Sequence, residues 1–272
     1  WAFSRIGCLA APQTDKLKLS VTIPTFNEEH NIGECLQRVA WADELIVLDS
    51  LSTDRTLEIA RQHTPKVFQR PFMGDFLDTR RYSIGLCSND WVLCLDADEF
   101  VTPELAEEIR QKLTTGDPEV NGYYLNRRVF HLGRWIDHCG WYPNYRLRLF
   151  RKSKARVEGT QPHDRIEVDG KTEYLKHHIE HRTYRNLADQ LKKIDRFSGW
   201  FAECRFKEGA RAGPVKIIGH SIAKFLRVYV LKLGFLDGFP GFVIAVLATY
   251  HTFLKYVKLW ELGQAARTKD ER

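Results

Sequence analysis

The sequence contains no Cys-x-x-Cys pair, although six cysteines occur among its 272 residues. Zinc sites normally use closely spaced cysteine pairs, so a zinc site is not expected here. The cysteines lie singly, several of them within apolar periodic segments. This pattern is typical of reduced, mostly buried thiols in a cytosolic protein.

The sequence also lacks internal repeats and low-complexity tracts. Residues 1–16 show no charged start followed by a long apolar stretch, so no signal peptide is predicted within them. Hydrophobic residues make up 43% and charged residues 28% of the chain, as in one globular domain with or without an appendage. The net charge of +6 is compatible with anionic lipid, nucleotide or nucleic acid and selects none of them.

Strand and helix patterns alternate from residue 17 to residue 117. Apolar runs predict strands at 17–24, 44–49, 66–68 and 91–95. Helices are expected at 31–39, 56–62, 79–87 and from 103 onward, the first with a capping box formed by Asn31 and Glu34. This alternation predicts an α/β fold with a mostly parallel sheet and helices on both faces.

The pattern changes after residue 118. Strands are expected at 122–130 and 146–150, separated by an aromatic loop, and a polar helix at 184–206. We therefore predict an N-terminal extension (1–16), a catalytic domain (17–183) and a helical C-terminal region (184–272). The catalytic domain would comprise a nucleotide-binding half, 17–117, and an acceptor half, 118–183.

Two aspartates follow the apolar run at 91–95. Asp96 and Asp98 are two positions apart, so in extended backbone their side chains point to one side. The carboxyl end of a strand is where open α/β sheets hold ligands. Paired carboxylates there suit Mg²⁺ or Mn²⁺ carrying a phosphate group. The alternative is a solvated acidic turn.

Polar clusters follow two other predicted strands. Asn27 and Glu28 follow the first strand, and Asp54 follows the second. Because the carboxyl ends of parallel strands share one edge, these side chains are expected to form one pocket with Asp96 and Asp98. The alternatives are a solvated turn for Asn27 and Glu28 and a helix N-cap for Asp54.

These strand-end segments carry a family resemblance. They are Pro-Thr-Phe-Asn-Glu-Glu (24–29), Asp-Ser-x-Ser-Thr-Asp-x-Thr (49–56) and Asp-Ala-Asp-Glu (96–99). Together they resemble the family 2 inverting glycosyltransferases, which have the GT-A fold. Further segments resemble the bacterial lipopolysaccharide inner-core glucosyltransferases: 40–44, Phe76 with Arg80, 140–143, 148–151, 234–238 and 253–256. The resemblance extends from about Lys18 to Glu261.

The resemblance implies roles for individual residues. Asp54 would accept a hydrogen bond from the nucleobase, and Asp96 would hold the ribose or assist the metal. Asp98 would ligate Mg²⁺ or Mn²⁺ directly. The base and the ribose of the nucleotide would be lined by Thr25, Asn27 and Glu28. Arg80 would pair with the diphosphate, or alternatively with Asp75 or Asp78 as a solvated helix residue.

An inverting transfer needs a base that takes the proton of the acceptor hydroxyl. The family subgroup has Val-His-Glu where this chain has Pro162, His163 and Asp164. Asp164 is the candidate base and His163 a neighbour that positions substrate or base; the alternative is an ordinary polar loop. Glu99 and Asp137 are the other candidates for the base.

The loop at 135–145 is rich in aromatic residues, which stack on sugar rings. Trp141 in this loop is the candidate acceptor contact, and a cluster of core aromatics is the alternative. The basic residues at 146–156 would either face a phosphorylated or acidic acceptor or form a solvated surface.

Residues 238–254 contain no Asp, Glu, Lys or Arg. That length is at the lower limit for a membrane span. Cationic and aromatic residues flank the segment, so 225–260 are expected to lie on the inner face of the cytoplasmic membrane. A helical hairpin packed on the catalytic domain and a true span are the alternatives.

These observations predict an inverting hexosyltransferase. It would move a glucose-like sugar, from a UDP-sugar, to a lipid-linked or lipopolysaccharide-core glycan, and would not bind nucleic acid. One alternative is a sugar-phosphate nucleotidyltransferase, but the glycine-rich phosphate loop typical of that class is absent from 24–29. The other alternative is a catalytically inactive, membrane-attached glycan-binding protein.

Overall fold

The structure is a computed structural model that describes residues 17–160 and 163–270. The predicted N-terminal extension, 1–16, lies outside the described residues. The chain forms two compact units. Of the described residues, the first unit comprises 17–96, 103–124, 147–160 and 163–175, and the second comprises 97–102, 125–146 and 176–270. A domain boundary at residue 183 stays a prediction.

Four parallel strands form the sheet of the first unit. In the order β3-β2-β1-β4 they are Val67–Gln69, Glu44–Asp49, Leu19–Thr25 and Trp91–Cys94. Strand β8 (Tyr145–Arg151) runs antiparallel beside β4. The predicted parallel arrangement is therefore confirmed for β1 to β4, since the connections between these four strands are crossovers rather than hairpins.

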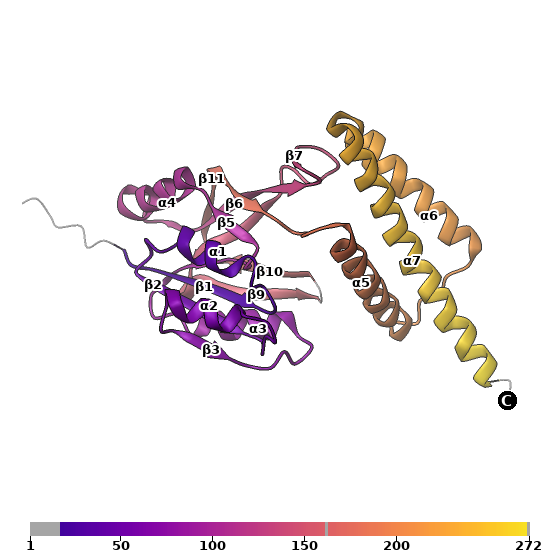
Figure 1. The fold of residues 1–272 in the computed structure, drawn as a ribbon, viewed down its shortest axis with the longest axis horizontal. Coiled ribbons are helices and arrows are strands. Elements are labelled where there is room, and N and C mark those ends of the chain that lie inside the picture. Colours follow the sequence, from indigo (N-terminus) through magenta and orange to yellow (C-terminus); the bar gives the residue numbers. More distant parts are fainter. Residues whose placement is uncertain (1–16, 161–162, 271–272) are drawn as a thin grey trace, which may run out of the picture. The chain divides into compact units, whose positions relative to one another are not determined.

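Helices cover this sheet (Figure 1). They are α1 (Ile32–Arg38), α2 (Thr56–His63), α3 (Phe76–Gly85) and α4 (Pro103–Thr115). Helix α3 packs with the hairpin β9–β10 (Ala155–Thr160 and His163–Val168) on one face, through Leu77, Ile84, Val157 and Ile166 against Val92 and Cys94. Buried side chains of β4 alternate between the two faces, which explains why the run at 91–95 is apolar throughout.

The expected capping box of α1 is absent. The side chain of Asn31 makes no cap hydrogen bond and instead donates to a carboxylate oxygen of Glu28, at 2.7 Å. Glu34 pairs with Arg38 one turn later, at 2.9 Å. The spacing of Asn31 and Glu34 is compatible with a capping box, but each side chain has another hydrogen-bond partner nearby in the sequence.

The sequence patterns predicted one strand of the second unit, at 122–130, and missed the others. This unit contains β5 (Glu99–Val101), β7 (Arg134–Ile136), and most of β6 (Val120–His131) and β11 (Lys171–His181). Strands β6, β11 and β5 lie next to one another in that order, and β7 pairs antiparallel with β6. Strand β11 was missed because its residues are mostly polar, with only Leu175, Ile179 and His181 buried.

Three helices complete the second unit (Figure 1). Helix α5 (Leu187–Lys207) and helix α6 (Pro214–Leu226) both pack on the long helix α7 (Gly238–Asp270). Short turns join α6 to α7: the π-helical Arg227–Leu231 and the 3-10 helix Gly234–Asp237. A further 3-10 turn, Lys152–Lys154, follows β8 in the first unit. The predicted α/β fold with a C-terminal helical region is confirmed.

The turn between α6 and α7 docks on the β7 loop. Asp237 is fully buried, and its carboxylate accepts hydrogen bonds from the amides of Asp137 and His138, at 3.2 and 2.9 Å. Ile136, Cys139, Val228, Ile244 and Ala245 form a buried apolar cluster there. The hairpin is therefore packed against residues of the expected catalytic domain, as one of the three alternatives for this segment required.

Candidate active site

The loops that follow β1 and β2 are joined by reciprocal hydrogen bonds. The Asn27 amide donates to Ser52 Oγ, and Asn27 Oδ1 accepts from the Thr53 amide, both at 2.8 Å. The Glu28 amide donates to Thr56 Oγ1 at 2.8 Å. Asn27 has a φ of 54°, in the left-handed region that asparagine tolerates better than most residues. Asn27 and Glu28 thus form a fixed loop rather than a solvated turn.

Asp54 is the centre of this junction. One carboxylate oxygen accepts from the amide and the hydroxyl of Thr56, and the other accepts from the amide of Glu29, at 3.2 Å. Burial raises the pKa of Asp54, but these hydrogen bonds outweigh it and hold the pKa below its ordinary value. The N-cap residue of α2 is Arg55, so Asp54 binds the first turn of the helix from one position further out.

Thr25 ends β1 at the same edge. Its hydroxyl is buried and has no hydrogen-bond partner within the described residues. Next to it in the sequence, Phe26 exposes 52% of its surface, and Leu51 in the facing loop exposes 47%. An unpartnered hydroxyl beside exposed apolar side chains suits a planar ligand with polar edges.

Asp96 is held by two guanidinium groups. Arg80 Nη2 lies 2.9 Å from one carboxylate oxygen, and Arg148 Nη2 contacts the other. The suggested pairing of Arg80 with Asp75 or Asp78 is wrong, because Asp75 caps α3 and Asp78 pairs with Arg70. Arg148 is buried on β8, and its contact with Asp96 was not foreseen.

Asp98 lies beside a histidine that the sequence analysis did not select. In the second unit the register pairs Glu99 of β5 with His181 of β11, and the Arg182 amide donates to the Asp98 carbonyl at 3.0 Å. His181 Nε2 is 3.3 Å from Asp98 Oδ2. Thr183 Oγ1 lies 3.0 Å from His181 Nδ1. The cluster of histidines at 177, 178 and 181 was the available signal in the sequence.

The carboxylate and imidazole of this pair suit a divalent metal ion. Within the described residues, no group of three or more His, Cys, Asp or Glu gathers as a metal site. If they held an ion, Asp98 and His181 would leave coordination positions open for phosphate oxygens and water. Thr183 would orient the imidazole ring through its contact with Nδ1.

The two reserve candidates for the base are both occupied. Glu99 is fully buried, and Arg127 Nη1 lies 3.0 Å from its carboxylate. Asp137 forms a bidentate pair with Arg128, at 2.9 Å for each bond. The hydrogen bonds from Arg128 lower the pKa of Asp137. The pair with Arg128 makes Asp137 a poorer proton acceptor, and Glu99 is buried in its pair with Arg127.

Asp164 and His163 lie at the start of β10. The register pairs His163 with Thr160 and Asp164 with Gly159 across the β9–β10 hairpin. They belong to the hairpin end that adjoins residues 161–162, which lie outside the described residues. Both residues lie on a strand, and not in the polar loop that was the alternative interpretation.

Trp141 belongs to an aromatic cluster in the second unit. Its ring lies 5.4 Å from His131 and 6.4 Å from Tyr184. It also packs on the apolar cluster under the α6–α7 turn, so the core-aromatic interpretation describes its contacts. Tyr145, at the end of the same loop, is 42% exposed.

The basic residues at 146–156 mainly form ion pairs within the first unit. Arg148 binds Asp96, and Arg156 contacts three carboxylates, those of Glu158, Glu167 and Asp169. These contacts describe a paired surface rather than a free basic patch.

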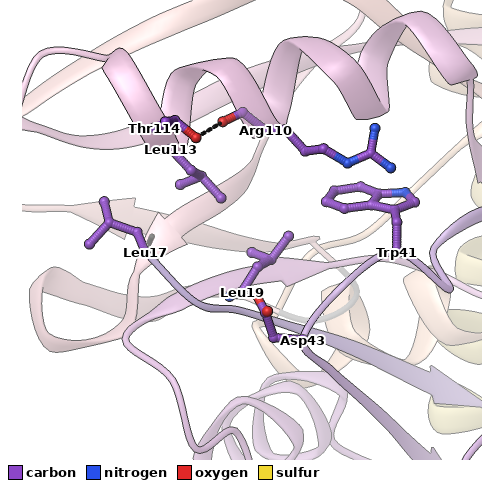
Figure 2. A pocket seen from close by; sticks show the side chains of 7 residues that line it. All are labelled: Leu17, Leu19, Trp41, Asp43, Arg110, Leu113 and Thr114. Atoms are coloured by element: carbon purple, nitrogen blue, oxygen red, sulfur yellow. Dashed lines mark hydrogen bonds between the residues drawn. The ribbon is translucent and has the colours of Figure 1, made fainter. Parts of the chain in front are cut away.

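A hollow in the first unit lies elsewhere (Figure 2). It is lined by Leu17, Leu19, Trp41, Asp43, Arg110, Leu113 and Thr114. The Arg110 guanidinium lies over the Trp41 ring, 4.7 Å from its centre. Leu19 begins β1 and Asp43 precedes β2, so this hollow is at the amino ends of the strands, opposite the edge that binds ligands in such sheets.

The family model for "Glycosyl transferase family 2" matches residues 20–168. This match includes every strand-end residue described above in the first unit. The chain belongs to glycosyl transferase family 2. The resemblance inferred from the motifs is confirmed, and the α/β sheet with flanking helices agrees with the GT-A fold.

Several glycosyltransferases are similar to this family 2 enzyme. An uncharacterized glycosyltransferase of Rickettsia typhi is 29% identical over 261 residues, which cover 92% of this chain and 89% of the relative. The lipopolysaccharide core biosynthesis glycosyltransferase LpsC of Rhizobium meliloti is 27% identical, over 90% of this chain and 93% of LpsC. The crystal structure of glucosyl-3-phosphoglycerate synthase from Mycobacterium tuberculosis covers 41% of this chain and 44% of its own, at 27% identity and a TM-score of 0.35.

Proposed function

We propose that this glycosyltransferase moves a glucose-like sugar from a UDP-sugar to a lipopolysaccharide-core or lipid-linked glycan, with Mg²⁺ or Mn²⁺. The observation that carries the proposal is the Asp98 carboxylate facing the His181 imidazole directly after the central strand β4. Similarity to LpsC over nearly the whole chain supports the acceptor class.

Residues at the loops after β1 and β2 would bind the nucleoside. Asp54 stays ionised because Thr56 and Glu29 donate to it, so it can accept a hydrogen bond from the uracil imide N–H. Thr25, Asn27 and Glu28 would contact the base and ribose. The unpartnered Thr25 hydroxyl supplies a donor at this edge.

Asp98 and His181 would hold the metal, which neutralises charge on the departing diphosphate when bound. Asp96 would contact the ribose or assist at the metal. Arg80 and Arg148 hold its carboxylate in place, and Arg80 would also pair with the diphosphate. Trp141 would line the acceptor side.

Asp164 would accept the proton of the attacking hydroxyl, and His163 would position it. The other two carboxylates considered for this step are paired with arginines. The pair with Arg128 lowers the pKa of Asp137, which disfavours it as a base.

We further propose that the C-terminal helices lie on the inner face of the cytoplasmic membrane. By length and composition, Gly234–Arg267 could cross a membrane, and 17% of its apolar window is buried. Exposed apolar side chains recur along α6, at Val215, Ile218, Ile222 and Leu226. A continuous apolar stripe of this kind on a surface helix is typical of attachment to the membrane interface.

Calorimetry of UDP binding with and without Mn²⁺ tests the metal assignment. Asp98→Ala and His181→Ala should each remove most of the metal-dependent affinity and turnover. Glu203→Ala, an exposed change on α5, is the matched control and should bind as the wild type does. Unchanged metal-dependent affinity in Asp98→Ala would contradict the assignment.

A panel of nucleotide sugars, assayed for donor hydrolysis and transfer, tests the donor. UDP-glucose should give the highest rate and release UDP. Release of pyrophosphate from a nucleoside triphosphate and a sugar phosphate would instead indicate a nucleotidyltransferase.

A further inference from the structure

Two turns of the second unit lie side by side, the turn that joins β6 to β7 and the turn that joins α6 to α7 (Figure 1). Arg134 Nη1 donates to the Asp237 carbonyl at 3.2 Å, and the Cys139 amide donates to the Lys232 carbonyl at 3.0 Å. The buried Asp237 carboxylate binds two further amides directly after β7. These hydrogen bonds fix the two turns to each other.

Large apolar side chains are exposed on both turns. We call residues 130–134 and 230–239 together the double turn. In its first part, Phe130 and Leu132 are exposed. In its second part the exposed apolar residues, with exposed fractions of 45–76%, are Val230, Leu231, Leu233, Phe235, Leu236 and Phe239. Exposed apolar side chains are normal when they are scattered singly, but a gathering of this density indicates an interaction surface.

Two leucines of the double turn have an unfavourable backbone conformation. Leu132 has a φ of 49° and Leu233 a φ of 53°, in the left-handed region where glycine and asparagine are favoured. Both side chains are exposed, so burial in the protein core does not offset the cost of placing leucine there. Leucine at such a position gains from contact with an apolar phase outside the protein.

The exposed charges of the double turn are positive. Its charged residues are Arg134, Lys232 and Asp237, and Asp237 is buried, where its carboxylate binds backbone amides. Asp137, directly after β7, is held in its bidentate pair with Arg128. Apolar side chains bordered by cations fit the surface of an anionic bilayer, because lipid tails accept the apolar groups and the headgroups attract the cations.

We propose that the double turn inserts into the lipid of an anionic membrane, so that the membrane-binding surface includes the β6–β7 turn as well as the C-terminal helices. The proposal rests on the proposed attachment of these helices and extends it to a segment far from them in the sequence. The exposed apolar stripe of α6 ends at Leu226, just before Val230, so the two apolar surfaces follow one another along the chain.

The loop that carries Trp141 follows the double turn directly. The Trp141 amide donates to the His138 carbonyl at 3.0 Å, and the His138 amide binds the Asp237 carboxylate. A membrane that holds the double turn therefore holds the start of this loop at the bilayer surface. The headgroup of a lipid-linked glycan lies at the same surface, so this arrangement favours a lipid-linked acceptor over a soluble one.

The test compares the full-length wild type with the double variant Leu132→Asn and Leu233→Asn. Asparagine adopts left-handed backbone more readily than leucine, so the melting temperature should match or exceed that of the wild type. Flotation with vesicles of phosphatidylglycerol and phosphatidylcholine should fall about tenfold, because two apolar side chains are removed from the lipid. Weaker lipid binding without lower stability excludes unfolding as the cause.

Leu51→Asn is the matched control. Leu51 also has left-handed backbone, with a φ of 63°, and is exposed, but it belongs to the first unit. The substitution makes the same change in the same backbone conformation, and flotation should stay at the wild-type level. An equal fall in flotation for Leu51→Asn would overturn the proposal, because the effect would then not depend on the double turn.

A second variant keeps the test decisive if the asparagine variant is less stable than the wild type. Leu231→Ser with Leu236→Ser changes two exposed side chains of the double turn whose backbone lies outside the left-handed region. Its flotation should also fall about tenfold. Wild-type flotation of this variant would show that the double turn does not enter the lipid.

Three results would contradict the proposal in different ways. If the double-turn variants float as the wild type does, and replacement of Val215, Ile218 and Ile222 by Ser abolishes flotation, attachment through α6 stands and insertion of the double turn fails. If the wild type does not float, both fail. If the wild type does not float but dimerises in sedimentation experiments, and the asparagine variant is monomeric, a second copy covers the double turn instead of lipid.

Discussion

At the residue scale, the site depends on carboxylates whose roles differ through their partners. Asp96 is held by two arginines, Asp98 faces an imidazole, and Asp137 is paired with Arg128. The residue type is the same in each case. The neighbours decide whether the carboxylate is held by guanidinium groups or lies beside an imidazole.

Asp164→Asn should lower the transfer rate by about 10²–10⁴-fold, the usual effect of losing a general base. The amide keeps the shape of the side chain but cannot accept the proton, so donor binding should persist. Steady-state rates at saturating acceptor measure the effect. Asp169→Asn, an exposed partner of Arg156, is the control and should keep wild-type rates. A wild-type rate in Asp164→Asn would exclude this residue as the base.

We predict that Glu44 stabilises the folded protein and that acid removes this stabilisation. Burial raises its pKa, but hydrogen bonds from Lys66, Ser20 and Ser88 outweigh it and lower the pKa from 4.5 to about 2. The folded state binds its proton less readily than the unfolded state, so the stabilisation is complete above about pH 4.5 and is lost toward pH 2. Lys66 is partly exposed, so we expect about 2–3 kcal/mol after screening.

Urea unfolding of Glu44→Gln between pH 7 and pH 2 checks this prediction. The difference in free energy of unfolding from wild type should shrink as the pH falls through that range. Glu58 forms an exposed ion pair with Arg55, so Glu58→Gln should leave the free energy of unfolding close to that of the wild type at any pH. A pH-independent difference for Glu44→Gln would show that its charge does not stabilise the fold.

At the scale of elements, backbone packing shapes the α6–α7 turn. A Cβ atom at Gly241 would lie 1.9 Å from the carbonyl oxygen of Gly234, and one at Gly234 would lie 2.8 Å from that of Val228. These contacts allow Asp237 to reach the amides at the β7 loop. The glycines are therefore required by close approach of backbone to backbone.

Gly241→Ala should destabilise the folded protein by about 1–3 kcal/mol, the typical cost of overpacking, because backbone atoms must move. Gly219→Ala is the matched control, since a Cβ there meets no atom within 4 Å. It lies inside α6 and should stabilise the helix by up to about 1 kcal/mol. Thermal unfolding of the two variants measures the contrast, and equal melting temperatures would contradict it.

At the scale of the whole molecule, the exposed apolar side chains of the C-terminal helices remain without a partner in the described residues. They include Val215 at 88% and Ile218 at 57% exposure. Few monomeric proteins leave such a patch in water, which supports the proposed attachment to a membrane.

Replacing Val215, Ile218 and Ile222 by Ser should weaken flotation with anionic vesicles about tenfold or more, because each side chain contributes apolar burial in the interface. Phe72→Ser with Met73→Ser, exposed in the first unit, is the control. These surface variants keep the buried cluster under the α6–α7 turn, which a truncation near residue 220 would uncover. Flotation unchanged by the triple variant would exclude this face.

Salt and alkaline extraction then separate attachment from a span. A protein lying on the surface should detach in high salt and in alkaline carbonate, because screening weakens the attraction of cations to anionic lipid. Resistance to both treatments would instead indicate that the helix crosses the membrane.

The sequence by itself determined the family, the parallel strands β1 to β4 and the position of the strand-end residues. These features depend on local signals: apolar runs, short motifs and the rule that parallel strands present their carboxyl ends at one edge. Asp96 and Asp98 were selected because they follow the apolar run at 91–95, and Asp54 because it lies in the polar cluster after the second strand.

Only the tertiary structure decided which partners these residues have. His181 and Arg148 come from strands far along the chain, and β11 is too polar to be recognised from periodicity. The same holds for Asp237, because its hydrogen bonds depend on which elements meet. Contacts between distant segments are set by packing and strand register, which short-range sequence patterns do not encode.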